Sequence, residues 1–172
     1  MSNAIKPREK TPNLKVRLIN GLEWSLEEQN PENFTLVVFY RGLHCPVCKN
    51  YLEDLATKIE DFKKRGVNVV AMSSDSEERA KEAGEKWNIP NLPLGFNFSI
   101  EEARKWGLYV SEAISDKEPK LFSEPGIFLI RPDQTLYFAS IQTMPFARPD
   151  FKQILGALDF VIAKKYPARG EA

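Results

Sequence analysis

Short blocks of apolar residues, some continuous and some alternating with polar residues, predict the strands of this chain. Residues 14–19 alternate apolar and charged side chains, which is typical of a half-exposed strand. The Asn-Gly dipeptide that follows predicts a hairpin turn, and residues 22–24 then form the returning strand. Residues 34–40 and 67–72 are nearly unbroken apolar runs, as expected of strands covered on both faces.

A long helix is predicted between these two apolar runs. Its apolar positions recur at helical spacing: Cys48, Tyr51, Leu52, Leu55, Ile59 and Phe62. Pro46 stands where proline is tolerated, in the first turn of a helix, and Gly66 follows the last turn. The helix therefore begins next to Cys45 and extends to about residue 65.

The second half of the chain predicts further helices and strands in order. They are a helix at 77–87, a short strand at 94–96, a short helix at 100–106, a polar surface excursion at 111–124, a hairpin of strands at 126–130 and 135–141, and a last helix that Asp150 caps. Strand, helix and strand in succession predict a parallel crossover unit. We therefore expect an α/β protein with a thioredoxin-like fold, in which a mixed central sheet has helices on both faces.

The domain is expected to span residues 14–168. Residues 1–13 are polar and contain two prolines, so they are interpreted as a disordered tail, in which residues 2–4 resemble a cloning remnant. This N-terminus lacks the apolar segment of a secretory signal, and no apolar stretch approaches the length of a membrane span. We therefore expect a cytoplasmic protein without a membrane partner.

Charge and cysteine content narrow the function classes. The 172 residues include 24 Lys plus Arg and 24 Asp plus Glu, and this balance does not indicate a nucleic-acid partner. Two cysteines do not make a disulfide framework, so a redox or metal role is more consistent with them.

Cys45 and Cys48 form a C-x-x-C motif at the predicted helix N-terminus. Free amide groups and the positive end of the helix dipole favour a thiolate there, and such settings lower the pKa of a first cysteine from ~8.5 to roughly 3.5–7.5. Cys45 lies at the open end and is expected to be the exposed attacking thiol. Cys48 lies in the apolar stripe and is expected to be the shielded thiol that resolves the intermediate.

Other interpretations of this segment stay open. The cysteines could be structural, because free cysteine is often buried. A zinc site needs four ligands, and the motif with His44 supplies only three, so we expect no metal and no cofactor. His44 could hold the thiolate or move a proton, or it could only shape the loop. Arg41 could lend positive charge to the thiolate, or it could be a solvated loop end.

Three segments resemble the alkyl hydroperoxide reductase / thiol-specific antioxidant (AhpC/TSA) family of peroxiredoxin-like proteins. They are residues 39–48, the strand from Pro125 to Ile130 with Asp133 and Tyr137 after it, and residues 144–149. The resemblance implies a thioredoxin-like fold, a nucleophilic cysteine that reduces peroxides, and a reductant of the thioredoxin or glutathione type.

Two positions differ from the family pattern. Peroxiredoxins carry Thr or Ser three residues before the peroxidatic cysteine, a place held by Gly42 if Cys45 is the match and by Cys45 itself if Cys48 is the match. They also carry an arginine in the strand that opens the hairpin, where this chain has Pro125. Thioredoxins hold a cis proline at that place, so the resemblance implies a cis Glu124–Pro125 bond beside the dithiol. Arg131 and Arg148 could replace the missing arginine, but both are interpreted as surface cations.

The resulting hypothesis is a thiol-based antioxidant oxidoreductase that reduces peroxides or disulfides through its dithiol. The alternative is a non-catalytic thioredoxin-fold module that binds a metal or a partner protein through the same loop. The oligomeric state stays open, a homodimer included.

Overall fold

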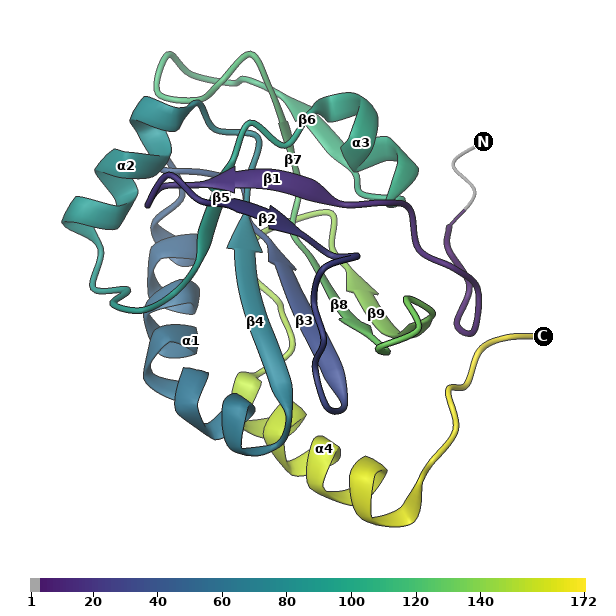
Figure 1. Cartoon of the computed structure of the whole chain (residues 1–172). Helices are drawn as coiled ribbons and strands as arrows, with labels where there is room; N and C mark the ends of the chain where they lie inside the picture. The colour runs from purple at the N-terminus through teal and green to yellow at the C-terminus, as the bar shows by residue number, and fades with distance from the viewer. Residues whose placement is uncertain (1–3) are drawn as a thin grey trace.

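A seven-stranded mixed sheet forms the centre of the computed structural model, which describes residues 4–172 (Figure 1). Its strand order is β2-β1-β5-β4-β3-β8-β9. The strands are β1 (Lys15–Leu18), β2 (Glu23–Ser25), β3 (Phe34–Phe39), β4 (Val67–Met72), β5 (Leu94–Phe96), β8 (Gly126–Ile130) and β9 (Leu136–Ile141). β3 is parallel to β4 and antiparallel to β8, so the predicted mixed sheet is confirmed.

Four helices and a separate two-stranded sheet complete the described residues. The helices are α1 (Pro46–Lys64), α2 (Glu77–Lys86), α3 (Ile100–Lys105) and α4 (Phe151–Lys164), and the small sheet pairs β6 (Val110–Glu112) with β7 (Leu121–Ser123). Within residues 4–172, every helix is too short or too polar to cross a bilayer.

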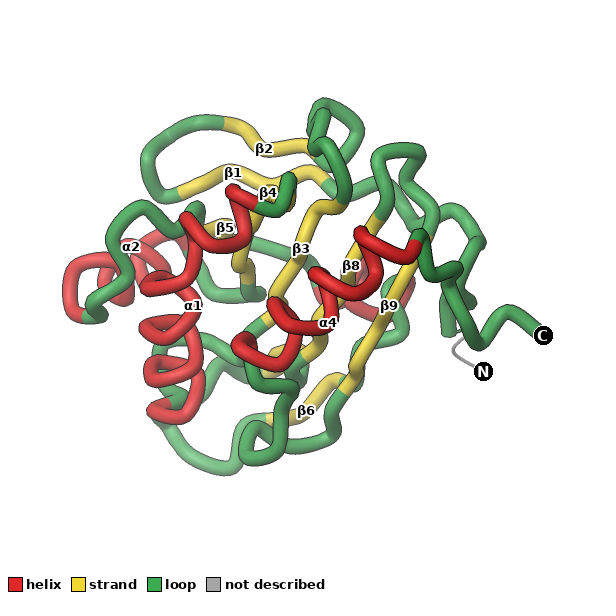
Figure 2. The backbone as a smooth tube through the Cα atoms, turned by 90° about the horizontal axis from the view of Figure 1, so that it is seen from below, coloured by secondary structure: helices red, strands yellow, loops and turns green. Residues whose placement is uncertain are grey.

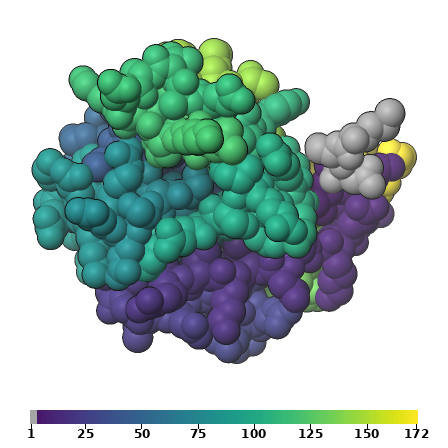
Figure 3. Space-filling view, turned by 90° about the horizontal axis from the view of Figure 1, so that it is seen from above, coloured from purple at the N-terminus to yellow at the C-terminus, as the bar shows by residue number. Residues whose placement is uncertain are grey.

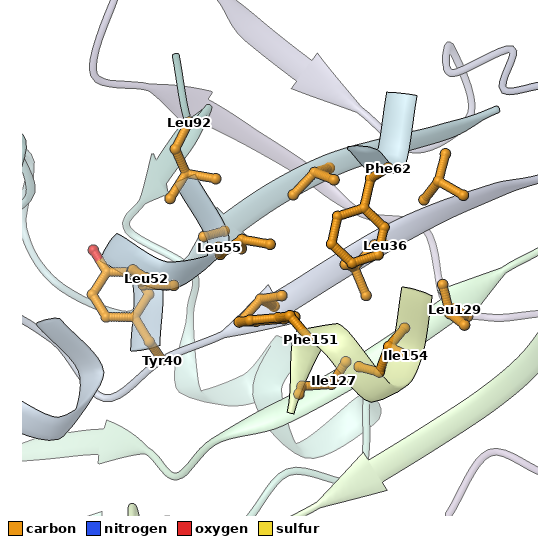
Figure 4. Packing of buried hydrophobic residues seen from close by; sticks show 14 of the residues in the cluster. Leu36, Tyr40, Leu52, Leu55, Phe62, Leu92, Ile127, Leu129, Phe151 and Ile154 are labelled. Carbon is orange, nitrogen blue, oxygen red and sulfur yellow. The ribbon is translucent and has the colours of Figure 1, made fainter. Parts of the chain in front are cut away.

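Two apolar clusters lie on opposite faces of the sheet, because successive side chains of a strand point to opposite sides. Leu36 and Val38 of β3 belong to the cluster that α1 and α4 cover, whereas Val37 and Phe39 belong to the cluster that includes α3. Figure 2 shows α1 and α4 over the same side of the sheet, and Figure 4 shows their residues against β3. The predicted α/β fold with helices on both faces is therefore confirmed.

The N-terminal segment departs from the expected disordered tail. Arg8 donates its amide to the carbonyl of Leu136, and Lys10 forms a β-bridge with Thr135. β9 is an edge strand with free backbone groups, and residues 8–11 satisfy some of them. Of the suggested cloning remnant, residues 2 and 3 lie outside the described residues.

Residues 111–124 are also more ordered than the expected surface excursion. The middle of this segment lies on the surface (green in Figure 3), but its ends form the strands β6 and β7. Phe122, Ser123 and Glu124 are buried. Since Glu124 and Pro125 precede β8, whose Gly126 pairs with Phe39 at the end of β3, this segment reaches the loop that carries the cysteines.

Candidate active site

Cys45 and Cys48 lie where β3 ends and α1 begins, as the sequence predicts. Cys45 is the N-cap residue of α1 and Pro46 is in its first turn. The Sγ atom of Cys45 accepts a hydrogen bond from the amide of Cys48, 3.2 Å away. One of the free amides of the helix end is therefore aimed at the sulfur of Cys45, which is the electrostatic arrangement that favours a thiolate.

The expected difference in exposure between the two thiols is not found. Cys45 is 1% exposed and Cys48 is 0% exposed, so both are buried, and both are free thiols. The prediction that Cys45 is exposed is therefore wrong. Arg148, from the loop before α4, lies against both sulfurs. A local helix pattern does not contain such a long-range contact, and this is why the prediction failed.

Arg148 is a part of the site rather than the surface cation that was expected. Its Nη2 atom lies 3.0 Å from the Sγ of Cys48 and 3.9 Å from the Sγ of Cys45. Its Nε atom donates to the carbonyl of Pro145 at 2.8 Å, which fixes the plane of the guanidinium. The dithiol therefore has a cation within hydrogen-bond distance.

These contacts separate the acidities of the two thiols. A hydrogen bond with the Cys48 thiol, the Cys48 amide, Arg148 and Arg41 together lower the pKa of Cys45 to about 6, against the opposing effect of burial. Burial raises the pKa of Cys48, and its hydrogen bond to Cys45 adds to this rise. At neutral pH the pair therefore holds its negative charge mainly on Cys45 and its proton on Cys48.

Arg41 is joined to Glu124 by a buried ion pair. Their Nε and Oε2 atoms are 3.0 Å apart, and Ser111 donates its hydroxyl to the Oε1 of Glu124 at 2.8 Å. The guanidinium of Arg41 also lies 4.9 Å from the centre of the Phe122 ring. The structure thus brings together two predicted site residues that are far apart in the chain, and Arg41 is not a solvated loop end.

His44 lies in the same loop but is not bonded to either sulfur. Its ring packs edge-on against Phe122, with centroids 4.8 Å apart, and neither ring nitrogen has a hydrogen-bond partner among the described residues. Burial lowers the pKa of His44, and the nearby Arg41 lowers it further. The imidazole is therefore neutral at pH 7, which agrees with a role in shaping the loop.

Asp75 holds the loop that leads to Cys45, a role that the sequence analysis missed. Its buried carboxylate accepts the amide of Leu43 at 2.8 Å and the Nε of Arg79 at 3.0 Å. Gly42 faces the same carboxylate, and a Cβ atom there would lie 2.6 Å from Oδ1. No pattern in the sequence indicates this role, because Asp75 stands among other polar residues in the stretch 73–79.

The bond before Pro125 differs from what the resemblance implied, and Arg131 lies outside the site. The described residues contain no cis peptide bond, so the Glu124–Pro125 bond is trans and the predicted cis bond is wrong. Pro125 is buried just before β8, and its carbonyl accepts the amide of Gln142. Arg131 lies over the rings of Phe34 and Tyr137 at the opposite end of β3 from the dithiol.

The site can stabilise a thiolate next to a second thiol, and the described residues form no metal centre around it. Within residues 4–172, no three His, Cys, Asp or Glu side chains are placed to hold one ion. A thiolate, a neighbouring protonated thiol and a guanidinium are the components of thiol-based redox chemistry. These groups fit the oxidoreductase hypothesis.

Several solved structures with a similar fold are peroxiredoxins or related proteins. A mutant of peroxiredoxin 6 of Arenicola marina matches with a TM-score of 0.79 and 22% identity, over 94% of this chain and 76% of that chain. The peroxidoxin BcpB of Mycobacterium tuberculosis matches with a TM-score of 0.74 and 15% identity, over 91% and 98%. AhpC of Mycobacterium tuberculosis matches with a TM-score of 0.75 and 13% identity, over 98% and 99%. At these identities the likeness establishes the thioredoxin-like fold of the peroxiredoxins.

Sequence comparison assigns the family. No curated protein matches the chain in sequence. The model of the AhpC/TSA family, however, matches residues 7–139, which include the dithiol, the Arg41–Glu124 ion pair, β8 and the first part of β9. The protein therefore belongs to the AhpC/TSA family and is a peroxiredoxin-like thiol oxidoreductase.

Proposed function

We propose that this oxidoreductase reduces peroxides with Cys45 as the attacking thiolate and Cys48 as the resolving thiol. One observation carries the proposal: the Cys45 sulfur accepts the free amide of Cys48 in the first turn of α1 and shares the guanidinium of Arg148 with Cys48. These contacts lower the pKa of Cys45 and leave the proton on Cys48.

The proposed first step is attack of the Cys45 thiolate on one peroxide oxygen. The O–O bond breaks as the S–O bond forms, so Cys45 becomes a sulfenic acid and the other oxygen leaves as an alcohol or as water after it takes a proton. In the second step the Cys48 sulfur attacks the sulfenic sulfur, forming an internal disulfide and releasing water. An external dithiol of the thioredoxin type, or two molecules of a glutathione-type thiol, then reduces the disulfide.

Burial of the sulfurs supports a small oxidant as the first substrate. Because Cys45 is 1% exposed, a peroxide reaches its sulfur with a smaller opening of the site than a protein disulfide needs. Disulfide exchange is the second candidate, and the C-x-x-C spacing favours it, because the same two thiols can resolve a mixed disulfide. A reducing compartment such as the cytoplasm would keep the resting dithiol reduced.

The mass of the intact protein after reaction with hydrogen peroxide tests this assignment. The wild type is expected to lose two hydrogens, Cys48→Ser to gain one oxygen, and Cys45→Ser to stay unchanged in the same time. If Cys45→Ser gains the oxygen and Cys48→Ser does not, the two roles are exchanged. A wild-type mass that stays unchanged under excess peroxide contradicts the proposed peroxidase activity.

Turnover distinguishes the two substrate classes. The reduced protein is mixed with a thioredoxin system, and consumption of NADPH is followed with hydrogen peroxide, with an organic hydroperoxide and with a small disulfide. We expect turnover with a peroxide that Cys45→Ser abolishes. Turnover with the disulfide alone would assign disulfide exchange to the same site.

A further inference from the structure

Tyr51 of α1 contacts the loop of residues 142–149 at the point where Arg148 reaches the dithiol. It lies one turn after Cys48 on the same helix. Its ring centre is 4.9 Å from the Arg148 guanidinium and 4.3 Å from the ring of Phe151, with which it is stacked at 29°. Its hydroxyl donates a hydrogen bond to the carbonyl of Pro149. The Tyr51 side chain therefore contacts Arg148 before Pro149, Phe151 after it, and the carbonyl of Pro149 itself.

Arg148 needs such support, because the loop around it offers little. Residues 142–149 form no helix or strand, and within this loop the guanidinium donates to the carbonyl of Pro145. The Nη1 atom is buried and has no partner among the described residues. A free arginine side chain samples many rotamers, so contact with an aromatic face limits this freedom and aims the guanidinium.

We propose that Tyr51 is a positioning residue, which holds the Arg148 guanidinium against the two sulfurs and thereby sets how readily Cys45 reacts. The proposal rests on the proposed function of the dithiol, although it concerns the reactivity of the thiol rather than its substrate. The hydroxyl of Tyr51 is bonded to the carbonyl of Pro149 and to neither sulfur. Its effect on Cys45 passes through Arg148.

The surroundings keep Tyr51 neutral. Burial raises the pKa of Tyr51, so its hydroxyl remains a donor throughout the range in which Cys45 ionises. The charged groups that act on it are Arg148 on the loop, Asp150 at the start of α4 and Asp54 on α1. Asp54 is paired with Lys58 of its own helix, which limits its effect on Arg148.

The test measures the reactivity of the thiol and needs no substrate. The rate of alkylation of Cys45 by iodoacetamide is followed against pH, and the alkylated cysteine is identified by peptide mass. The reduced proteins compared are the wild type, Tyr51→Phe, Tyr51→Leu, Tyr51→Met, Arg148→Ala and the double variant Tyr51→Leu/Arg148→Ala. Tyr166→Leu, which removes an aromatic ring beyond the far end of α4, is the matched control. Leu and Met both remove the ring, so one folded variant of the two is sufficient.

Loss of the ring is expected to raise the apparent pKa of Cys45 by roughly one unit, as expected when a cation is displaced from a thiolate. Tyr51→Phe keeps the ring and should retain most of the wild-type profile. The double variant should behave like Arg148→Ala alone, because Tyr51 acts only through Arg148.

Three results would overturn the proposal: a wild-type profile in a folded ring-less variant, an impairment in Tyr51→Phe as large as in that variant, or effects of Tyr51→Leu and Arg148→Ala that add in the double variant. A wild-type Cys45 that itself ionises like free cysteine would instead contradict the proposed function. The two failures are therefore distinguishable.

Discussion

Arg148 donates to the sulfur of Cys48 from 100 positions away in the chain, with 3.0 Å between Nη2 and Sγ. The same nitrogen lies 3.9 Å from the sulfur of Cys45. A buried dithiol that carries one negative charge needs a nearby cation or hydrogen-bond donors, because burial alone would keep both thiols protonated. The loop before α4 therefore completes an anion site that the helix N-terminus begins.

Arg148→Ala is expected to raise the apparent pKa of Cys45 by roughly one unit, because an opposite charge within reach of a thiolate lowers its pKa by about that amount or more. Alkylation rates against pH measure the change. Arg148→Lys keeps the charge but not the planar fork, and should give an intermediate profile.

Arg131→Ala is the matched control, because Arg131 also lies over aromatic rings but at the other end of β3. Its profile should equal that of the wild type. An Arg148→Ala protein with an unshifted profile would show that the amide of Cys48 and the remaining groups suffice to stabilise the thiolate.

The pKa of Cys45 should also make the stability of the reduced protein depend on pH. The pKa is about 6 in the folded chain and roughly 8.5 in the unfolded one, so the folded state loses its proton first. The resulting stabilisation is fully present above about pH 8.5 and is lost as the pH falls through about 6. Between these values its slope is at most ~1.4 kcal/mol per pH unit.

Urea unfolding of the reduced wild type and of Cys45→Ser at several pH values between about 5.5 and 8.5 measures this contribution. Serine is a good N-cap residue, so this variant keeps an acceptor for the Cys48 amide. The difference in unfolding free energy should increase with pH in favour of the wild type. The raised pKa of Cys48 opposes this trend only at pH values above the ordinary pKa of a thiol, where Cys48 ionises in the unfolded chain before it does in the folded one. A pH-independent difference would contradict a depressed pKa of Cys45.

Local patterns were sufficient for the dithiol and for most of the sheet. Cys45, Pro46 and Cys48 lie at a helix start because the apolar run before them and the helical spacing after them are both properties of neighbouring residues. Arg148 was not predictable in this way. Its position depends on the path of an irregular loop, and no periodicity describes such a path.

Glu124 and Asp75 illustrate a second limit of sequence reasoning. Both are carboxylates in polar stretches, so their sequence surroundings indicate exposure. In the structure both are buried: Glu124 contacts Arg41 and Ser111, and Asp75 accepts the amide of Leu43 from far away in the chain and the Nε of Arg79 from one turn along. The burial of a charge depends on its tertiary partners, which a single sequence does not reveal.

Gly42→Ala is expected to destabilise the protein by about 2 kcal/mol and to slow alkylation of Cys45. Gly42 has a φ of +144°, which side chains disfavour, and a Cβ atom would lie 2.6 Å from Oδ1 of Asp75. The control is Gly156→Ala, in the interior of α4 with nothing within 4 Å of its Cβ. This change should instead stabilise the helix by up to ~1 kcal/mol. Urea unfolding of both variants tests the pair, and equal stabilities would contradict the strain at Gly42.

Asp75→Ala should be more destabilising than loss of an exposed helix cap. It removes the acceptor of the Leu43 amide and the partner of Arg79 from a fully buried position, at a cost of about 2–4 kcal/mol. Ser99→Ala, which removes the cap of α3, should cost about 1 kcal/mol. Asp75→Asn keeps one acceptor oxygen, and its loss of stability is expected to lie between those of Asp75→Ala and Ser99→Ala.

Because the Leu43 amide fixes the loop before Cys45, Asp75→Ala should also slow alkylation at pH 7, whereas Ser99→Ala should not. An Asp75→Ala protein as stable and as reactive as Ser99→Ala would show that the loop keeps its shape without this carboxylate.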